Sequence, residues 1–337
     1  MSKALTPIAF VAAIAEAYQR RGMDPGGVLA QARIAPALLR RASAHISAAQ
    51  METVSAAAMR ELDDEALGWF ERRLPWGSYG MLARASLSAP TLGIAMARWC
   101  RHHALLARAV VIELHEEGAA AGFRLHEHGD ALPPAMRELC LVTLLRNLHG
   151  VASWFVDSRI SLRATRLPFA APPHAEVYPL LFPGPVEFGA ATAGFDFDAG
   201  YLALPLRRDE RAMRAMLKHA LPVMVRPYRR DRLLVRRVAE LLAHDPLHMV
   251  DAAALARELH ISPRTLHRQL QAEGASLQAL KDEARRARAI ELLERSREPI
   301  KRIAQACGFA SEKSFARAFG GWTGMAPSAW RARGGGA

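Results

Sequence analysis

The chain has 337 residues, of which 51% are hydrophobic and 23% charged, a globular composition that excludes a largely disordered or fibrous protein. At roughly 100–200 residues per domain, this length predicts two domains, or three at most. Lysine and arginine (45) outnumber aspartate and glutamate (33), and the net charge of +12 indicates an anionic partner, either nucleic acid or an acidic membrane surface.

The cysteines and the apolar runs bear on the compartment. Cys100, Cys140 and Cys307 lie far apart, which argues against a disulfide framework or a cysteine-based zinc site and fits a reducing compartment. No apolar run is expected to reach the ~18–20 residues that span a bilayer. Residues 1–20 have the pattern of an amphipathic helix rather than of a signal peptide. We therefore expect a cytoplasmic protein without a membrane partner.

The first 225 residues predict an α+β domain in which helices lead and a small mixed sheet follows. Apolar periodicity predicts helices over residues 7–20, 26–33, 48–62, 80–87, 91–105 and 136–156. Strand-like runs lie at 110–115 and 121–126, around a hairpin signal at Glu116-Glu117-Gly118, and at 159–166, 186–188 and 193–198.

This region also contains candidates for a small-molecule site. Aromatic side chains often line such pockets, although they are more often simply part of a core. The aromatic candidates are Trp76, Tyr79, Trp99, Phe123 and Trp154. His103 joins them, and Arg146, in the long apolar helix, could pair with a carboxylate ligand or with an internal acid.

Motifs for metals or catalysis are not found in this sequence. His102-His103 and His126-Glu127-His128 lack the spacing of a known zinc motif, so we expect no metal. The sequence has no Gly-x-Ser-x-Gly elbow, no phosphate-binding glycine loop and no His-Glu-x-x-His. We therefore expect no catalytic residue and no cofactor.

Charge divides the chain near residues 225–230. Residues 226–337 contain 21 lysines and arginines against 12 acids, which is +9 of the total +12. The run RPYRRDR from Arg226 to Arg232 marks the change, and the nearby prolines indicate a linker. We expect domains over 1–225 and 226–333, with a disordered tail over 334–337. The basic second domain is suited to binding phosphates.

A repeat lies within the last hundred residues. LARELHISPRTLHRQL (255–270) and IAQACGFASEKSFARAF (303–319) each place an apolar residue four, an arginine six and an apolar residue eight positions after a serine. Each copy predicts a helix, a tight turn and a second helix capped by that serine, Ser262 or Ser311. Gly308 suits the second turn because glycine tolerates positive φ. One inserted residue, Ala310, separates the two registers.

The segment between the copies predicts a long helix from Ser276 to Arg295. Twenty residues would span about 30 Å. Major-groove faces recur about every 34 Å along one side of a duplex. One chain could therefore place two helices in successive grooves, with a bend in the DNA making up any shortfall.

The stretch from Asp231 to Arg333 resembles the DNA-binding domain of the AraC/XylS family of bacterial transcription regulators. The resemblance depends on LARELHISPRTLHRQLQAEG, RRARAIELLE and PIKRIAQACGFASEKSFARAFGGWTGMAPSAWRA. Gly320-Gly321 stands where a basic residue is common in the family, and Trp330 where tyrosine is common. Most of residues 5–220 are similar, less sharply, to an arabinose-binding-like N-terminal domain of a subgroup that includes regulators related to ornithine use. That similarity depends on LPWGSYGMLARASLSAPTLGIAMARWCRHHALL and PVEFGAATAGFDFDAGYLALPL.

The resemblance implies that the outer faces of both second helices enter the major groove of double-stranded DNA. Carried over by position, the implied base readers are Arg264, Thr265, His267 and Arg268, and then Glu312, Lys313, Ser314 and Arg317. For each of them a phosphate contact or plain solvent exposure is the alternative. The resemblance further implies an activator that responds to a small-molecule effector held by residues 1–225. We also expect dimerisation through residues 1–220, because paired operator half-sites multiply affinity, and RNA polymerase is a further expected partner.

Two other functions stay open at this point. The first is an enzyme that carries the same DNA-binding module, as alkyl-transfer DNA-repair proteins do, and it would need an activated cysteine. The second is an architectural DNA-binding protein that is indifferent to sequence. Equal affinity for promoter and random DNA would favour the architectural protein.

Overall fold

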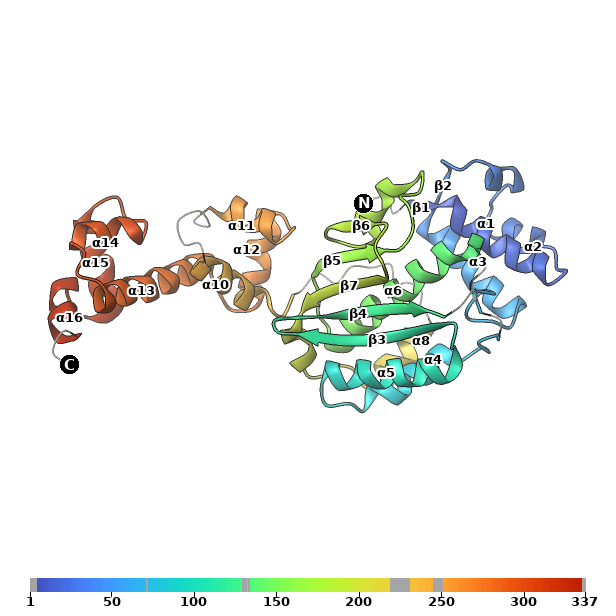
Figure 1. Cartoon of the computed structure of the whole chain (residues 1–337), viewed down its shortest axis with the longest axis horizontal. Coiled ribbons are helices and arrows are strands. Elements are labelled where there is room, and N and C mark those ends of the chain that lie inside the picture. Colours follow the sequence, from blue (N-terminus) through green and yellow to red (C-terminus); the bar gives the residue numbers. More distant parts are fainter. Residues whose placement is uncertain are drawn as a thin grey trace. The chain divides into compact units, whose positions relative to one another are not determined.

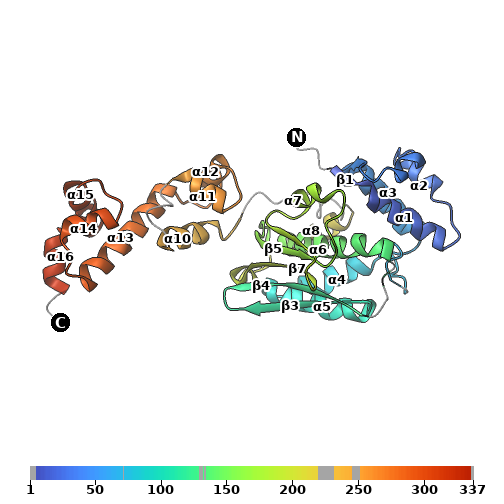
Figure 2. The same cartoon turned by 45° about the horizontal axis from the view of Figure 1, so that its top comes forward.

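The computed structural model describes residues 5–70, 72–128, 132, 134–218, 231–244 and 251–334. It divides into two compact units, Met1–Arg230 and Asp231–Ala337 (Figures 1 and 2). The linker expected at 225–230 lies outside the described residues, as does the expected disordered tail apart from Gly334.

The first unit begins with helices around a small ribbon. Strand β1 (Leu5–Pro7) pairs antiparallel with β2 (His45–Ser47), which is why the first helix starts at residue 8 and not at 7. The helices here are α1 (Ile8–Arg20), α2 (Gly26–Gln31), the short 3-10 helix η1 (Pro36–Arg40) and α3 (Ala48–Glu61). Helix α2 ends early because Arg33 has a positive φ of 55°. A capping box formed by Ser47 and Gln50 starts α3.

A five-stranded mixed sheet follows, which confirms the predicted α+β class. Its strands are β3 (Val110–Glu117), β4 (Ala120–Glu127), β5 (Leu162–Leu167), β6 (Val186–Phe188) and β7 (Ala193–Asp198), in the order β3-β4-β7-β5-β6. Only β5 and β6 run parallel. Strand β5 starts later than predicted because the carbonyl of Ile160 accepts from His149 Nε2 at 2.7 Å instead of pairing with a strand.

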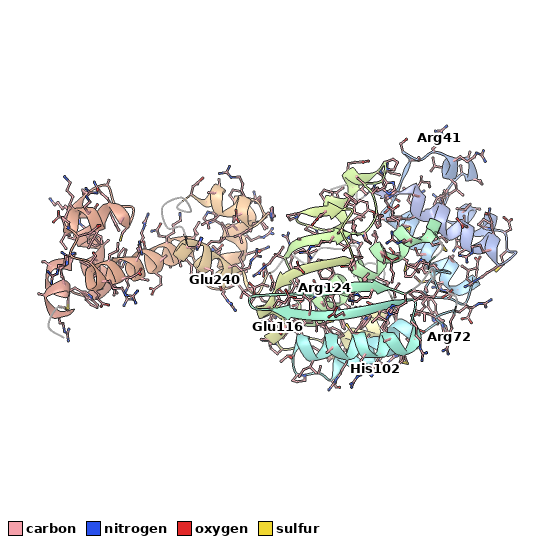
Figure 3. All side chains as sticks on the ribbon, viewed as in Figure 1. Arg41, Arg72, His102, Glu116, Arg124 and Glu240 are labelled. Atoms are coloured by element: carbon pink, nitrogen blue, oxygen red, sulfur yellow. The ribbon has the colours of Figure 1, made fainter. Side chains whose placement is uncertain are left out.

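The two faces of this sheet differ in chemistry. Phe123, Phe195 and Phe197 are fully buried and pack edge-on or tilted against one another, with ring centroids 5.4–6.1 Å apart. The opposite face is polar, and there Arg124 pairs with Glu117 at 3.1 Å beside the hairpin turn at Gly118 (Figure 3). One face of the sheet therefore belongs to the core and the other is open.

Helices cover the apolar side of the sheet and complete the unit. They are α4 (Ser78–Leu87), α5 (Leu92–Leu106), α6 (Pro134–Val156), α7 (Tyr178–Leu181) and α8 (Glu210–Leu217), with short 3-10 helices η2 (Ala175–Val177) and η3 (Ala199–Ala203). Helix α6 contacts α1, α5 and β7.

Helix α6 corrects one expectation about apolar runs. Its stretch Met136–Val156 has 21 residues and a mean hydropathy of 1.4, enough by length and composition to cross a membrane. Within the unit, however, 78% of that stretch is buried by protein. Its contacts with α1, α5 and β7 make it the central core helix of this unit.

The second unit is entirely helical in its described part. It contains α10 (Leu234–His244), α11 (Ala252–Glu258), α12 (Pro263–Ala272), α13 (Leu277–Arg295), α14 (Ile300–Ala306), α15 (Glu312–Thr323) and α16 (Pro327–Gly334). Two separate cores hold it together. The first gathers Leu255, Leu266 and Leu270 with α10, and the second gathers Ile303, Phe315 and Phe319. Helix α13 belongs to both cores, which confirms the two helix-turn-helix motifs joined by a long helix.

Candidate functional site

The turns of the two motifs have the same backbone geometry. His260 and Gly308 both take left-handed φ values, 51° and 76°. The next residue then donates its backbone N–H across the turn: Ile261 to the carbonyl of Ala256, and Phe309 to that of Ala304, each at 2.9 Å. These matching bonds set the entry angle of α12 and of α15 in the same way.

Serines begin both second helices. The Oγ of Ser262 accepts from the backbone N–H of Thr265 at 3.1 Å, and the Oγ of Ser311 accepts from that of Ser314 at 3.2 Å. Pro263 takes the first position of α12, where its missing N–H has no cost. The inserted Ala310 lies before the cap of α15, so it lengthens the turn without changing the helix.

Seven of the eight implied base readers are exposed to solvent, and Thr265 is half-buried. The exposed ones are Arg264, His267, Arg268, Glu312, Lys313, Ser314 and Arg317. Thr265 and Ser314 have a second task, because the hydroxyl of Thr265 lies 2.8 Å from Ser262 Oγ and the hydroxyl of Ser314 donates to the carbonyl of Ser311 at 2.7 Å. Glu312 is the first residue of α15, where a carboxylate stabilises the positive end of the helix.

The cations of these helices are free, whereas those of α13 are paired. Among the described residues Arg264, Arg268, Lys313 and Arg317 have no ion pair. On α13, by contrast, Arg285, Arg286 and Arg288 each lie 2.9–4.0 Å from an acid three residues away. In the described part of the chain, both second helices therefore carry positive charge outside any ion pair, whereas three arginines of the helix that joins them are paired.

Side chains of α13 and α16 hold the second motif in place. The guanidinium of Arg285 lies 5.4 Å above the ring of Phe309, so this arginine supports the turn instead of facing solvent. Trp330 packs edge-on against Phe319, at 5.7 Å, and its Nε1 donates to Glu294 at 3.3 Å. Tryptophan therefore fills a structural position where the family commonly has tyrosine.

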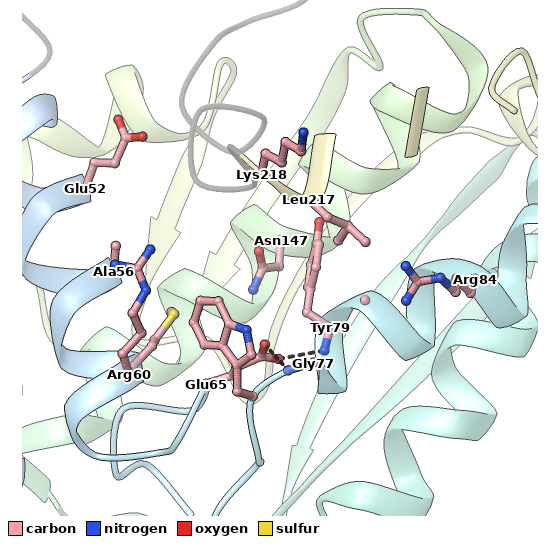
Figure 4. A pocket seen from close by; sticks show the side chains of 13 residues that line it. Glu52, Ala56, Arg60, Glu65, Gly77, Tyr79, Arg84, Asn147, Leu217 and Lys218 are labelled. Carbon is pink, nitrogen blue, oxygen red and sulfur yellow. Dashed lines mark hydrogen bonds between the residues drawn. The ribbon is translucent and has the colours of Figure 1, made fainter. Parts of the chain in front are cut away.

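The first unit contains a cavity of about 480 Å³, built from four helices and one loop (Figure 4). Its walls include charged, aromatic and amide side chains. They are Glu52, Ala56, Met59 and Arg60 of α3, Glu65, Trp76 and Gly77 of the following loop, Tyr79, Gly80 and Arg84 of α4, Asn147 of α6, and Leu217 and Lys218 at the end of α8. The predicted aromatic candidates Trp76 and Tyr79 belong to this wall.

Glu65 joins the loop to α4 at this cavity. Its two carboxylate oxygens accept from the backbone N–H groups of Gly77 and Tyr79, at 2.7 and 2.6 Å (dashed lines in Figure 4). Burial raises the pKa of Glu65, and the two backbone hydrogen bonds oppose that rise. Arg60 lies 5.6 Å above the ring of Trp76, and Arg84 lies 3.7 Å from Glu210 of α8. The cavity thus offers both signs of charge beside an exposed aromatic ring.

The five other candidates for a ligand site lie elsewhere. Phe123 belongs to the sheet core, and the ring of Trp154 lies 5.5 Å below the guanidinium of Arg208. Arg146 donates to the carbonyl of Leu181, and burial lowers its pKa to about 10. Trp99 and His103 line a smaller chamber of about 60 Å³. Sequence alone brought none of the other lining residues forward, because no local motif connects the four helices and the loop that line the large cavity.

The cysteines are poor nucleophiles. All three are free and buried. Burial raises the pKa of Cys100 to about 12 and that of Cys307 to about 11, and it also raises that of Cys140. A thiol of this kind is inert toward alkyl transfer at neutral pH. Across the described residues, no group of three or more His, Cys, Asp or Glu side chains could hold a metal.

Comparisons with known proteins agree with these two units. Residues 22–206 match the family described as the arabinose-binding domain of AraC transcription regulators, N-terminal, and residues 255–333 match a helix-turn-helix domain family. An ornithine utilization regulator of Pseudomonas aeruginosa is 28% identical over 97% of this chain and 96% of its own. The transcriptional regulator VirS of Mycobacterium tuberculosis is 27% identical over 93% and 92%. A crystal structure of a DNA-binding transcriptional dual regulator from Escherichia coli K-12 is 31% identical, covers 30% of this chain and 92% of that one, and has a TM-score of 0.29.

Proposed function

This chain belongs to the AraC transcription regulators that carry an arabinose-binding N-terminal domain, and from that premise we propose that α12 and α15 read two successive major grooves of its operator. The chain is a DNA-binding transcription regulator and not an enzyme. The observation that carries the proposal is the repeated placement of an exposed, unpaired arginine six residues after each capping serine, Arg268 and Arg317.

Geometry supports the two-groove arrangement. Helix α13 has 19 residues and is therefore about 28 Å long. Successive major-groove faces are about 34 Å apart, so a modest bend of the DNA would bring both second helices into contact. Arg264, His267 and Arg268 would then face bases in one groove, and Lys313 and Arg317 in the next. Thr265 and Ser314 would lie near the helix starts, beside the phosphates, whereas the carboxylate of Glu312 would accept from a base such as cytosine.

Hydroxyl-radical footprinting of the full chain on the region upstream of its own gene tests this arrangement. We expect two protected stretches on one side of the duplex, about one helical turn apart. A circular-permutation gel shift should report a bend in the same complex. Protection without sequence preference, with equal affinity for random DNA at physiological salt, would instead identify an architectural protein.

We further propose that the 480 Å³ cavity of the first unit holds the effector. Glu52 and Glu65 on its wall face Arg60, Arg84 and Lys218, so the cavity suits a small molecule with ionised groups. One relative is an ornithine utilization regulator, which makes amino acids and small carboxylates the first compounds to try. A thermal-shift screen should find one that raises the melting temperature, and Trp76→Ala should abolish the rise.

Helix α8 offers a route from the cavity to the DNA-binding unit. It is the last described helix before Asp231, its Leu217 and the following Lys218 line the cavity, and its Glu210 pairs with Arg84. An effector that contacts Leu217 and Lys218 would stabilise one position of α8 over another, and so one arrangement of the chain that follows. We also propose that the protein acts in the cytoplasm as an activator, together with RNA polymerase, and as a dimer that forms through its first unit.

A further inference from the structure

The outward side of α12 contains one more polar side chain than the family resemblance implies. Residues three, four and seven positions apart lie on one side of a helix. Arg264, His267, Arg268 and Gln271 have this spacing, and all four are exposed to solvent. The leucines of α12 that join the core of the first motif lie on the opposite side. Gln271 therefore belongs to the same surface as the three proposed base readers.

The position of Gln271 along the helix suits a contact with a base. Homeodomains read the major groove with four residues of one helix at these same spacings. The rise from Arg264 to Gln271 along α12 is about 10 Å, which corresponds to about three base pairs of ~3.4 Å each. Gln271 is thus placed to reach a base pair at the far end of the stretch that α12 covers.

The chemistry of the Gln271 amide selects one base. Within the described part of the chain this amide has no hydrogen-bond partner. An amide has both a donor and an acceptor, whereas an arginine can only donate. In the major groove, adenine is the base that presents one acceptor, N7, beside one donor, the N6 amino group. The amide N–H would donate to N7, and the amide oxygen would accept from N6.

The second motif has no side chain at the equivalent position. Gln271 lies nine residues after the capping Ser262, and Gly320 lies nine residues after the capping Ser311. Gly320 is not among the glycines with positive φ, and a Cβ added to it would come no closer than 3.9 Å to its nearest neighbour. The fold therefore does not require glycine there. The difference between the two motifs lies in the surface that they offer to DNA.

We propose that Gln271 is a fourth base reader of α12, which binds the adenine of an A·T pair through two hydrogen bonds. The half of the operator under the first motif then contains an A·T pair that the half under the second motif does not need. This inference depends on the proposed reading of DNA by α12 and α15. It adds a specificity-determining residue and the base that this residue selects.

The test is affinity selection by the full chain from a library of DNA duplexes with a randomised central segment. We expect the parent chain to select adenine at one position that Gln271→Ala leaves unspecified. Gln271→Glu should change that position to cytosine, because a carboxylate accepts from the N4 amino group of cytosine. Gel shifts on two duplexes that differ only at this base pair should show that Gln271→Ala loses roughly 5- to 100-fold of the preference for A·T.

Gln278→Ala is the matched control, since the amide of Gln278 on α13 already donates to Asp282 at 2.9 Å, and it should select the parent sequence. A Gln271→Ala variant that selects the parent sequence, or that loses affinity equally for every base, would overturn the inference. So would a loss of A·T preference in the half-site of the second motif. Arg268→Ala separates the two failures. If Arg268→Ala changes the selected sequence and Gln271→Ala does not, this inference alone is wrong, whereas a parent chain that selects no sequence contradicts the proposed function itself.

Discussion

Arg268 and Arg317 occupy the same position in the two motifs, so their substitutions can be compared directly. We expect Arg268→Ala to cost about 1–3 kcal/mol at one base pair of the operator and to flatten the preference there, if the guanidinium binds guanine with two hydrogen bonds. Quantitative gel shifts on a set of single-base operator variants measure this. Arg286→Ala is the matched control, since Arg286 on α13 is already paired with Glu283. A uniform loss over all sequences would identify a phosphate contact instead.

His103 makes stability depend on pH in a predictable direction. Burial lowers its pKa to about 4, whereas an unfolded histidine has a pKa of about 6.5. As pH falls, the unfolded chain therefore binds the proton first, and stability is lost between about pH 6.5 and pH 4. We expect urea unfolding to show that His103→Phe avoids a loss of roughly 3 kcal/mol over that range. The exposed His128 is the control: His128→Gln should follow the parent protein, and a His103→Phe curve that does so too would contradict the prediction.

Residue-scale prediction of exposed positions and helix caps succeeded where a local helical period sets them. The exposed positions of α12 and α15 follow from a helical period counted from a capping serine, and both caps are present. The cavity depends on contacts between α3, a loop, α4, α6 and α8, which no local period contains. Trp76 is 56% exposed in a loop with a glycine and a proline beside it. It and the nearby Tyr79 were the readable signs of the cavity.

The turns of the two motifs differ at one position, and that difference can be tested. His260 and Gly308 both have left-handed backbone, at φ 51° and 76°, and only glycine adopts it without steric cost. We expect His260→Gly to stabilise the second unit by up to about 1 kcal/mol and Gly308→Ala to destabilise it by a similar amount. Urea unfolding measures both. Equal effects of the same sign would show that side-chain contacts outweigh backbone conformation here.

The loop between α3 and α4 depends on one buried carboxylate. Asp64 is fully buried, accepts from the backbone N–H groups of Ala66, Gly68 and Leu74 at 3.0 Å, and pairs with Arg21 at 2.5 Å. Asp64→Ala would leave the guanidinium unpaired and free the loop. We expect a loss of about 3–5 kcal/mol in the free energy of unfolding, measured in urea.

A control for the Asp64 variant lies in the same loop. The neighbouring Asp63 is exposed, so Asp63→Ala should cost far less than Asp64→Ala. A melting curve of Asp64→Ala that overlays that of the parent protein would show that the loop is held by its apolar contacts instead.

At the scale of elements, many helices and strands were predictable, and the ones that were missed include β1, β2, α8 and α10. Strands β6 and β7 begin and end at the predicted residues. The ribbon of β1 and β2 has three residues in each strand, too few to show a period. Helix α10 buries Leu234, Val238 and Leu242. Their spacing of four residues is typical of a helix, but no helix was predicted directly after the linker expected at 225–230. Helix α8 is short, and it is defined by its packing on α4 as much as by its own pattern.

The whole molecule should separate into parts that work alone. Both cores of the second unit consist of residues between Leu234 and Trp330, and residues 226–337 carry +9 of the net charge. We expect the purified fragment 226–337 to fold and to shift operator DNA, with affinity that falls steeply as salt rises. Residues 1–225 are the matched control and should bind no DNA. Failure of the 226–337 fragment to bind would contradict the division near 225–230.

Helix α13 has a consequence for the genome as well as for the protein. It joins the two helices that we propose to read bases, and these are not copies of each other, since one presents Arg264, His267 and Arg268 and the other Glu312, Lys313 and Arg317. A single chain therefore has no twofold axis, and the DNA site that fits it is no palindrome. If such a site is inverted in the DNA, the protein binds it in the opposite orientation. Each bound subunit thus has a direction along the chromosome, and the strand order of its target decides which neighbouring gene it points toward.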